Sequence, residues 1–202
     1  MLKILEFNKK RSSKNLEMIL NKRKSIQKNQ TSVVNKIIKN VKKNGDKAVL
    51  NYEKRFSKIK KKNNKVLFSN AEINKISKKT DKSIQKAIDL AYNRIKKFHS
   101  KQKISSFKFK DKYKNDLSYK HTAIEKVGVY VPGGTASYPS TVLMNCIPAI
   151  VAGVKKIYLT TPSLDSKINP AVVYAAKKCR VKKIYKTGGA HSKNLVVLAS
   201  QV

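Results

Sequence analysis

The feature of this sequence that most constrains its fold lies in the second half, where three short apolar runs alternate with helical segments. The runs cover residues 127–131, 156–160 and 183–186, and each has the length of a buried strand. About two dozen residues separate one run from the next, which is enough for a helical crossover between parallel strands. We therefore predict that residues 124–202 form a parallel βαβαβα unit, an incomplete Rossmann-like α/β domain.

The segments between these runs have the apolar spacing of helices. The first predicted helix ends at Gly153 and the second near Cys179. Pro148 lies inside the first and is expected to kink or restart it. A last helix is predicted through Leu195 and Leu198.

The first part of the chain is rich in Lys and Asn, and we predict a mostly helical N-terminal region over residues 1–123. Thr31 is a candidate N-cap, and Asn44-Gly45 is expected to end the helix that Thr31 begins. A longer helix is predicted to begin at Thr80 or Asp81.

Two stretches of this region, 53–68 and 103–120, have no clear periodic pattern. Within the second, residues 107–110 alternate Phe and Lys, which predicts the start of an edge strand. The Lys side chains are expected to discourage further pairing at that edge.

The chain carries a large positive charge. It has 47 Lys and Arg against 11 Asp and Glu, a formal net charge of +36, which can attract nucleic acid or an anionic membrane. Few of the basic residues are Arg, whose planar group suits phosphate and guanine. Lys spread along the chain together with abundant Asn and Ile is typical of an AT-rich genome. We therefore predict no specific nucleic-acid partner, and polyanion binding is the alternative.

Membrane and secreted classes are not expected. No apolar run approaches the roughly 18 residues that a membrane-spanning helix needs. Residues 1–15 are basic but contain only a short apolar stretch, which is not the pattern of a secretory signal.

The residues that most often ligate metals or catalyse reactions are scattered. Cys146 and Cys179 are far apart in the sequence with no CxxC motif, and we expect both to be small buried residues in a reducing environment. His99, His121 and His191 form no HxxxH or HExxH motif. Carboxylates are few and none is paired for acid–base work. We therefore predict no metal ligands and no catalytic residues in this chain.

Two of the predicted strands are followed by paired glycines, Gly133-Gly134 and Gly188-Gly189. Ligands of open parallel sheets bind beyond the carboxyl ends of the strands, and glycine there lets the backbone approach a phosphate or another anion. The glycines can equally serve only to make tight turns. Neither stretch is a GxGxxG or Walker sequence, and His191 is the one histidine near such a turn.

A longer motif contains the first of these turns. Residues 125–149 read Glu-Lys-Val-Gly-Val-Tyr-Val-Pro-Gly-Gly-Thr-Ala-Ser-Tyr-Pro-Ser-Thr-Val-Leu-Met-Asn-Cys-Ile-Pro-Ala, and this run resembles the signature of the histidinol dehydrogenase family. The similarity continues at residues 152–155, 161–162, 169–171, 184–190 and, near the N-terminus, 42–52.

The resemblance implies a function. Members of that family oxidise L-histidinol to L-histidine in two successive steps with two NAD⁺ and one zinc ion per site, as cytoplasmic homodimers. Their motif tyrosine contacts NAD, and here it is Tyr130. We expect Tyr130, Gly133, Gly134 and His191 to be the cofactor-binding residues of this chain.

The sequence departs from the family pattern in two ways. His191 stands where the family usually has a Gln that contacts NAD, and the match weakens after Ala190. Family chains are also much longer, and their zinc ligands and their Glu-His acid–base pair lie in the C-terminal half that has no counterpart here. We therefore interpret the chain as an N-terminal portion that is inactive alone. The alternatives are a non-catalytic nucleotide-binding or interaction protein and, less favoured, a basic nucleic-acid-binding module.

Overall fold

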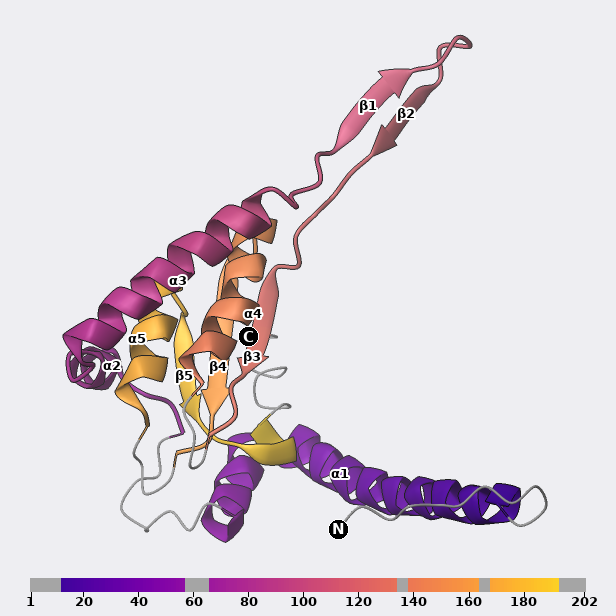
Figure 1. Cartoon of the computed structure of the whole chain (residues 1–202), viewed down its shortest axis with the longest axis vertical. Coiled ribbons are helices and arrows are strands. Elements are labelled where there is room, and N and C mark those ends of the chain that lie inside the picture. Colours follow the sequence, from indigo (N-terminus) through magenta and orange to yellow (C-terminus); the bar gives the residue numbers. More distant parts are fainter. Residues whose placement is uncertain (1–11, 57–65, 134–137, 164–167, 193–202) are drawn as a thin grey trace.

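The structure is a computed structural model that describes residues 12–56, 66–133, 138–163 and 168–192 (Figure 1). In chain order its helices and strands are α1 (Ser12–Phe56), α2 (Asn70–Ser77), α3 (Lys82–Ser100), β1 (Phe107–Lys110), β2 (Asp116–Tyr119), β3 (Lys126–Tyr130), α4 (Pro139–Ala152), β4 (Lys156–Thr161), α5 (Pro170–Lys178) and β5 (Lys183–Lys186).

The centre of the fold is the predicted three-stranded sheet. Its strand order is β3-β4-β5 and both pairs are parallel, with Val129 opposite Leu159 and Leu159 opposite Ile184. The three strands lie where the apolar runs predicted them, which confirms the α/β fold class. The last predicted helix, through residues 195–198, lies outside the described residues.

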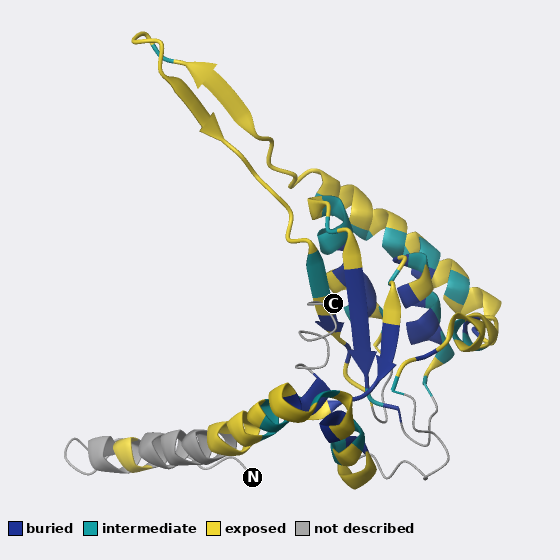
Figure 2. Ribbon diagram, turned by 180° about the vertical axis from the view of Figure 1, so that it is seen from behind, coloured by how far each residue is buried: buried dark blue, intermediate teal, exposed yellow. Residues whose placement is uncertain are grey.

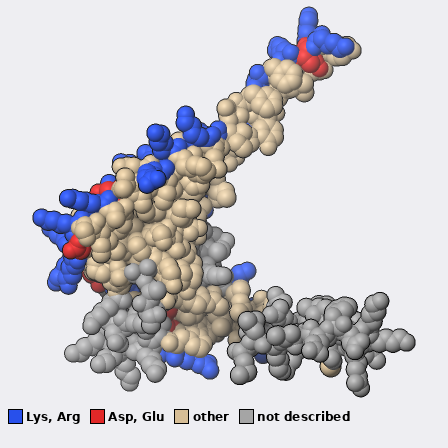
Figure 3. Space-filling model, in the orientation of Figure 1, with Lys and Arg blue, Asp and Glu red and all other residues tan. Residues whose placement is uncertain are grey.

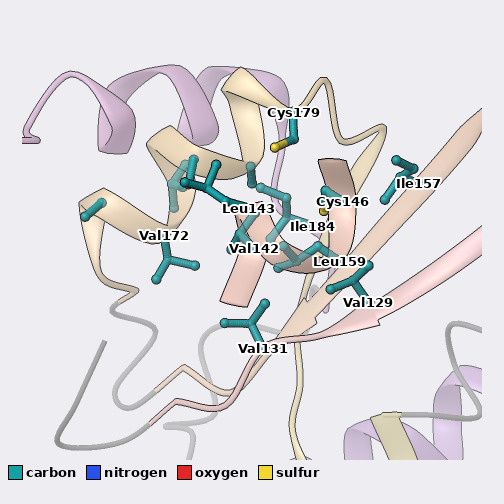
Figure 4. Close-up of a cluster of buried hydrophobic side chains, with 14 of the residues drawn as sticks. Val129, Val131, Val142, Leu143, Cys146, Ile157, Leu159, Val172, Cys179 and Ile184 are labelled. Atoms are coloured by element: carbon teal, nitrogen blue, oxygen red, sulfur yellow. The ribbon is translucent and has the colours of Figure 1, made fainter. Parts of the chain in front are cut away.

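Helices α4 and α5 cover one face of this sheet, and α3 packs across both of them (Figure 1). Because side chains alternate along a strand, Ile157 and Leu159 of β4 point into this helical layer, while Tyr158 points to the other face. Figure 4 shows the resulting core. Its fully or nearly fully buried members include Val129, Val131, Val142, Leu143, Ile147, Leu159, Val172 and Ile184.

The two cysteines meet in this core. Both are buried and free, and a hydrogen bond between them, together with burial, raises the pKa of the Cys146 thiol. The prediction that both are small buried residues is confirmed. Their distance along the sequence gave no sign that α4 and the end of α5 bring them together.

The end of α1 packs against the opposite face of the sheet, where Val41 and Val49 contact Tyr158 and Tyr185. Between those valines the helix is kinked at Gly45, whose φ is 53°, a value that glycine adopts without steric cost. The predicted break at Asn44-Gly45 is therefore in the right place. The predicted start at Thr31 is wrong, because the helix already runs from Ser12.

The predicted start of α3 and the predicted ends of α4 and α5 agree with the structure. Asp81 caps α3, and its carboxylate accepts from the Ser83 backbone N–H at 2.7 Å. Helix α4 ends at a left-handed Gly153. It continues through Pro148 as a single helix, so the helix does not restart there. Ser69 and Glu72 form a reciprocal capping box at the start of α2.

The stretch 103–120, which has no clear periodic pattern, contains an antiparallel hairpin of β1 and β2 that projects from the rest of the molecule (Figures 1 and 2). The predicted domain boundary at residue 123 lies in the extended segment between this hairpin and β3. The division into two domains stays a prediction. Helices α1 and α3, which precede the boundary, pack against elements that follow it.

Candidate functional site at the carboxyl ends of the strands

The carboxyl ends of β3, β4 and β5 meet at one edge of the sheet. Tyr130 ends β3 and is 37% exposed. Beside it in the ladder, Thr160 of β4 is buried and its hydroxyl donates to the Thr187 carbonyl oxygen at 2.7 Å. Tyr130 is thus an accessible aromatic side chain at the edge where open parallel sheets bind their ligands.

Two of the predicted glycines are required by close packing. A Cβ atom on Gly133 would lie 2.8 Å from the carbonyl oxygen of Pro162, and one on Gly188 would lie 2.8 Å from the Pro162 ring. Real Cβ atoms do not approach so closely, so the proline after β4 is held between two turns that only glycine can make. This observation supports the tight-turn interpretation of both glycines. Gly134 lies outside the described residues.

A buried carboxylate from α1 organises the turn after β5. Glu53 Oε1 accepts hydrogen bonds from the Thr187 hydroxyl at 2.5 Å, the Gly188 backbone N–H at 2.9 Å and the His191 ring at 2.7 Å. All of these groups are buried. Such a carboxylate is stable in the interior only when several donors surround it.

His191 lies inside the protein beside that carboxylate. Its Nε2 faces Glu53, and its ring lies 5.6 Å from the Tyr52 ring and 5.9 Å from the Phe56 ring, measured between centroids. The side chain is buried, so it must leave Glu53 before it can touch a nucleotide. Its role as a cofactor contact stays a prediction.

Sequence reasoning missed Glu53. A signal for it was present in the sequence. Val49, Tyr52 and Phe56 form an apolar or aromatic helical face, and Glu53 lies on that face because it is four residues after Val49. A carboxylate at that position of a buried face is expected to have a donor from another element. One of its three donors is His191, which follows 138 residues later in the sequence.

The last residue of β5 is also engaged within the protein. Lys186 Nζ lies 2.9 Å from Glu72 Oε1 and 4.3 Å from the centroid of the Phe68 ring. A hydrogen bond from the Ser69 backbone N–H lowers the pKa of the Glu72 carboxyl below its ordinary value, and Lys186 lowers it further. This ammonium group is therefore not poised for an external anion.

The chemistry that the edge offers is binding. Tyr130 presents a ring and a hydroxyl, which suit stacking and hydrogen bonding. Within residues 12–56, 66–133, 138–163 and 168–192, no three His, Cys, Asp or Glu side chains gather closely enough to hold a metal ion. None of the helices in that same part of the chain has the length and apolar character needed to cross a membrane.

Comparison with known proteins identifies the family. The family model for histidinol dehydrogenase matches residues 20–196. The chain belongs to the histidinol dehydrogenase family. Histidinol dehydrogenase of Pelagibacter ubique is 54% identical over 190 residues, which cover 94% of this chain and 43% of that protein. That of Brucella abortus is 42% identical over 159 residues, covering 79% of this chain and 37% of that protein.

A solved structure agrees with the sequence comparisons. The crystal structure of histidinol dehydrogenase from Elizabethkingia anophelis matches with a TM-score of 0.75 at 35% identity, over 81% of this chain and 38% of that one. The chain thus spans about two-fifths of the length of the histidinol dehydrogenases that it matches.

Proposed function

We propose that this chain is the N-terminal, NAD-binding portion of a histidinol dehydrogenase, which oxidises L-histidinol to L-histidine in two successive steps of histidine biosynthesis. The observation that carries the proposal is the family match over residues 20–196. The complete enzyme is proposed to work in the cytoplasm as a homodimer. NAD, when bound, accepts the hydride in each step.

The carboxyl edge of the sheet is the proposed NAD site. Tyr130 is accessible there, at the end of β3, and offers both a ring and a hydroxyl. Gly133 follows β3 closely and lies beside Pro162, and Gly134 is the next residue in the sequence; both are proposed contacts. His191 is the fourth proposed contact, and it reaches a nucleotide only if its ring moves away from Glu53.

Zinc does not fit the described residues, which bring no set of three ligands together. We therefore place the zinc ligands and the acid–base pair in the C-terminal portion of the family protein. Glu53 and His191 do not substitute for that pair in the arrangement seen here, because both are buried and bonded to each other. The role of this chain is to bind and orient NAD.

The proposal is tested by comparing this chain with a fusion in which it replaces the matching part of the Pelagibacter ubique enzyme. NADH formation from L-histidinol is measured for both proteins with added zinc. The fusion is expected to turn over, and the chain alone is not. Turnover by the chain alone above about 1 s⁻¹, the low end for enzymes, contradicts the assignment of the catalytic groups.

A further inference from the structure

One face of the β1–β2 hairpin is apolar and uncovered. Phe107 lies opposite Tyr119, and Phe109 lies opposite Leu117. Since side chains alternate along each strand, these four residues share one face. They are 57%, 54%, 53% and 44% exposed in that order. We call this set the aromatic face of the hairpin.

The other face of the hairpin is polar. Lys108 lies opposite Ser118, and Lys110 lies opposite Asp116. A diagonal ion pair joins Lys108 Nζ to Asp116 Oδ2 at 3.5 Å. The hairpin therefore has the alternating pattern of a sheet with one solvent face and one buried face, although among the described residues the apolar side stays exposed.

The tip of the hairpin is firmly built. The Asp111 carboxylate accepts from the backbone N–H groups of Tyr113 at 2.8 Å and Asn115 at 2.9 Å. Lys114 adopts the left-handed backbone region with φ 67°, which allows its N–H to donate to the Asp111 carbonyl oxygen at 3.0 Å. These bonds fix the register that places the four apolar residues on one face.

An exposed face of this kind needs a partner. An isolated two-stranded hairpin is marginally stable in water, and contiguous exposed apolar patches mark interaction surfaces. The Phe107 ring stacks on those of Phe109 and Tyr119 at centroid distances of 6.3 and 5.9 Å. The face is thus already ordered before a partner binds, which lowers the entropic cost of docking.

The hairpin adjoins the amino end of β3, at the opposite end of that strand from Tyr130. Ile104 and Ile124 are exposed at the base of the hairpin, and β3 follows directly. Among the described strands β3 pairs only with β4, so its other edge is open. Figures 1 and 2 show the hairpin and α1 projecting toward the same side of the molecule, with β3 between them. On the face drawn in Figure 3, the stem of the hairpin is mostly free of basic side chains, which gather at its tip.

We propose that the aromatic face docks onto the C-terminal portion of a histidinol dehydrogenase polypeptide. This inference rests on the proposed function. The Pelagibacter ubique relative aligns with 94% of this chain, but only 43% of that relative is matched, so most of the family protein has no counterpart here.

A second copy of this chain is a poorer occupant. Each copy carries a formal charge of +36, and Lys110, Lys112 and Lys114 surround the tip of the hairpin, so two copies repel each other. The face fits a complementary surface with apolar residues in the centre and carboxylates at the rim.

The test is thiol labelling at the hairpin. Phe109→Cys and the matched control Lys108→Cys are made in this chain and in the fusion with the Pelagibacter ubique enzyme. Cys146 and Cys179 of this chain are buried, and each parent protein without the new cysteine is labelled in parallel as the background. In the fusion, we expect Cys labelling at position 109 to be about tenfold slower or more than at position 108, because a covered thiol reacts only after local opening. In the chain alone the two rates should be similar.

Two results overturn the proposal. One is equal labelling of positions 108 and 109 in the fusion. The other is slow labelling of position 109 in the chain alone that becomes slower as the protein concentration rises, because that result assigns the face to a second copy. Leu117→Cys with the control Ser118→Cys repeats the comparison if Phe109→Cys disturbs the hairpin. NADH formation by the unmodified fusion separates the two ideas: an active fusion with an unprotected position 109 retains the function and rejects the docking.

Discussion

Replacing Glu53 by Ala should destabilise the chain strongly, because one carboxylate oxygen accepts three hydrogen bonds at the junction of α1 and the sheet. The partners are the Thr187 hydroxyl, the Gly188 N–H and the His191 ring, all buried. Removing one member of a buried, hydrogen-bonded pair costs about 3–5 kcal/mol, since the other members stay buried without it. We expect a loss of that size in the free energy of unfolding.

The assay is urea unfolding of the 202-residue chain. The matched control is Glu17→Ala, an exposed Glu on the same helix, which should change the free energy of unfolding by no more than about 0.5 kcal/mol. The double variant with His191→Ala completes a thermodynamic cycle. A coupling energy between positions 53 and 191 of about 0.5–3 kcal/mol is expected for groups in one network.

His191→Gln, which installs the residue usual in the family, adds a graded comparison. A Gln amide can still donate to Glu53 but loses the ring contacts with Tyr52 and Phe56, so we expect a loss of about 1–2 kcal/mol, smaller than for Glu53→Ala. The reasoning is refuted if Glu53→Ala costs less than about 1 kcal/mol or if the cycle gives no coupling.

Two further predictions concern packing and pH. Gly188→Ala places a Cβ atom 2.8 Å from the Pro162 ring and should lower the free energy of unfolding by about 1–3 kcal/mol, the usual cost of overpacking; an unchanged urea midpoint counts against the close packing at Pro162. Because the pKa of Glu72 is lowered in the folded state, its stabilising contribution is present above its ordinary value of 4.5 and is lost as pH falls below it. Glu72→Gln should therefore flatten the fall in stability with acid, and a parallel pH profile for the two proteins speaks against this.

The parallel sheet was predictable because its signal is local and strong. Each strand is a short apolar run at 127–131, 156–160 or 183–186, and each pair is separated by a helical segment of crossover length. Burial on both faces makes such runs almost uniformly apolar. The same locality made the break at Gly45 predictable.

The missed features depend on long-range contacts or on weak patterns. The early start of α1 is missed because residues 12–30 carry many polar residues and no clear apolar stripe. In the hairpin, the Phe-Lys alternation of β1 is visible, but its partner Asp116–Tyr119 has only two apolar residues. The Glu53–His191 contact joins residues 138 positions apart, and only the packing of α1 on the sheet creates it.

The affinity of the fusion for NAD tests the central claim most directly. Tyr130→Ala removes the accessible ring and hydroxyl at the end of β3, and the control Tyr113→Ala removes an exposed tyrosine from the tip of the hairpin. We predict that Tyr130→Ala weakens NAD binding, measured by calorimetry, by about 1–3 kcal/mol, while Tyr113→Ala leaves it unchanged. An unaltered NAD affinity in the Tyr130→Ala protein contradicts the assignment of this edge of the sheet as the NAD site.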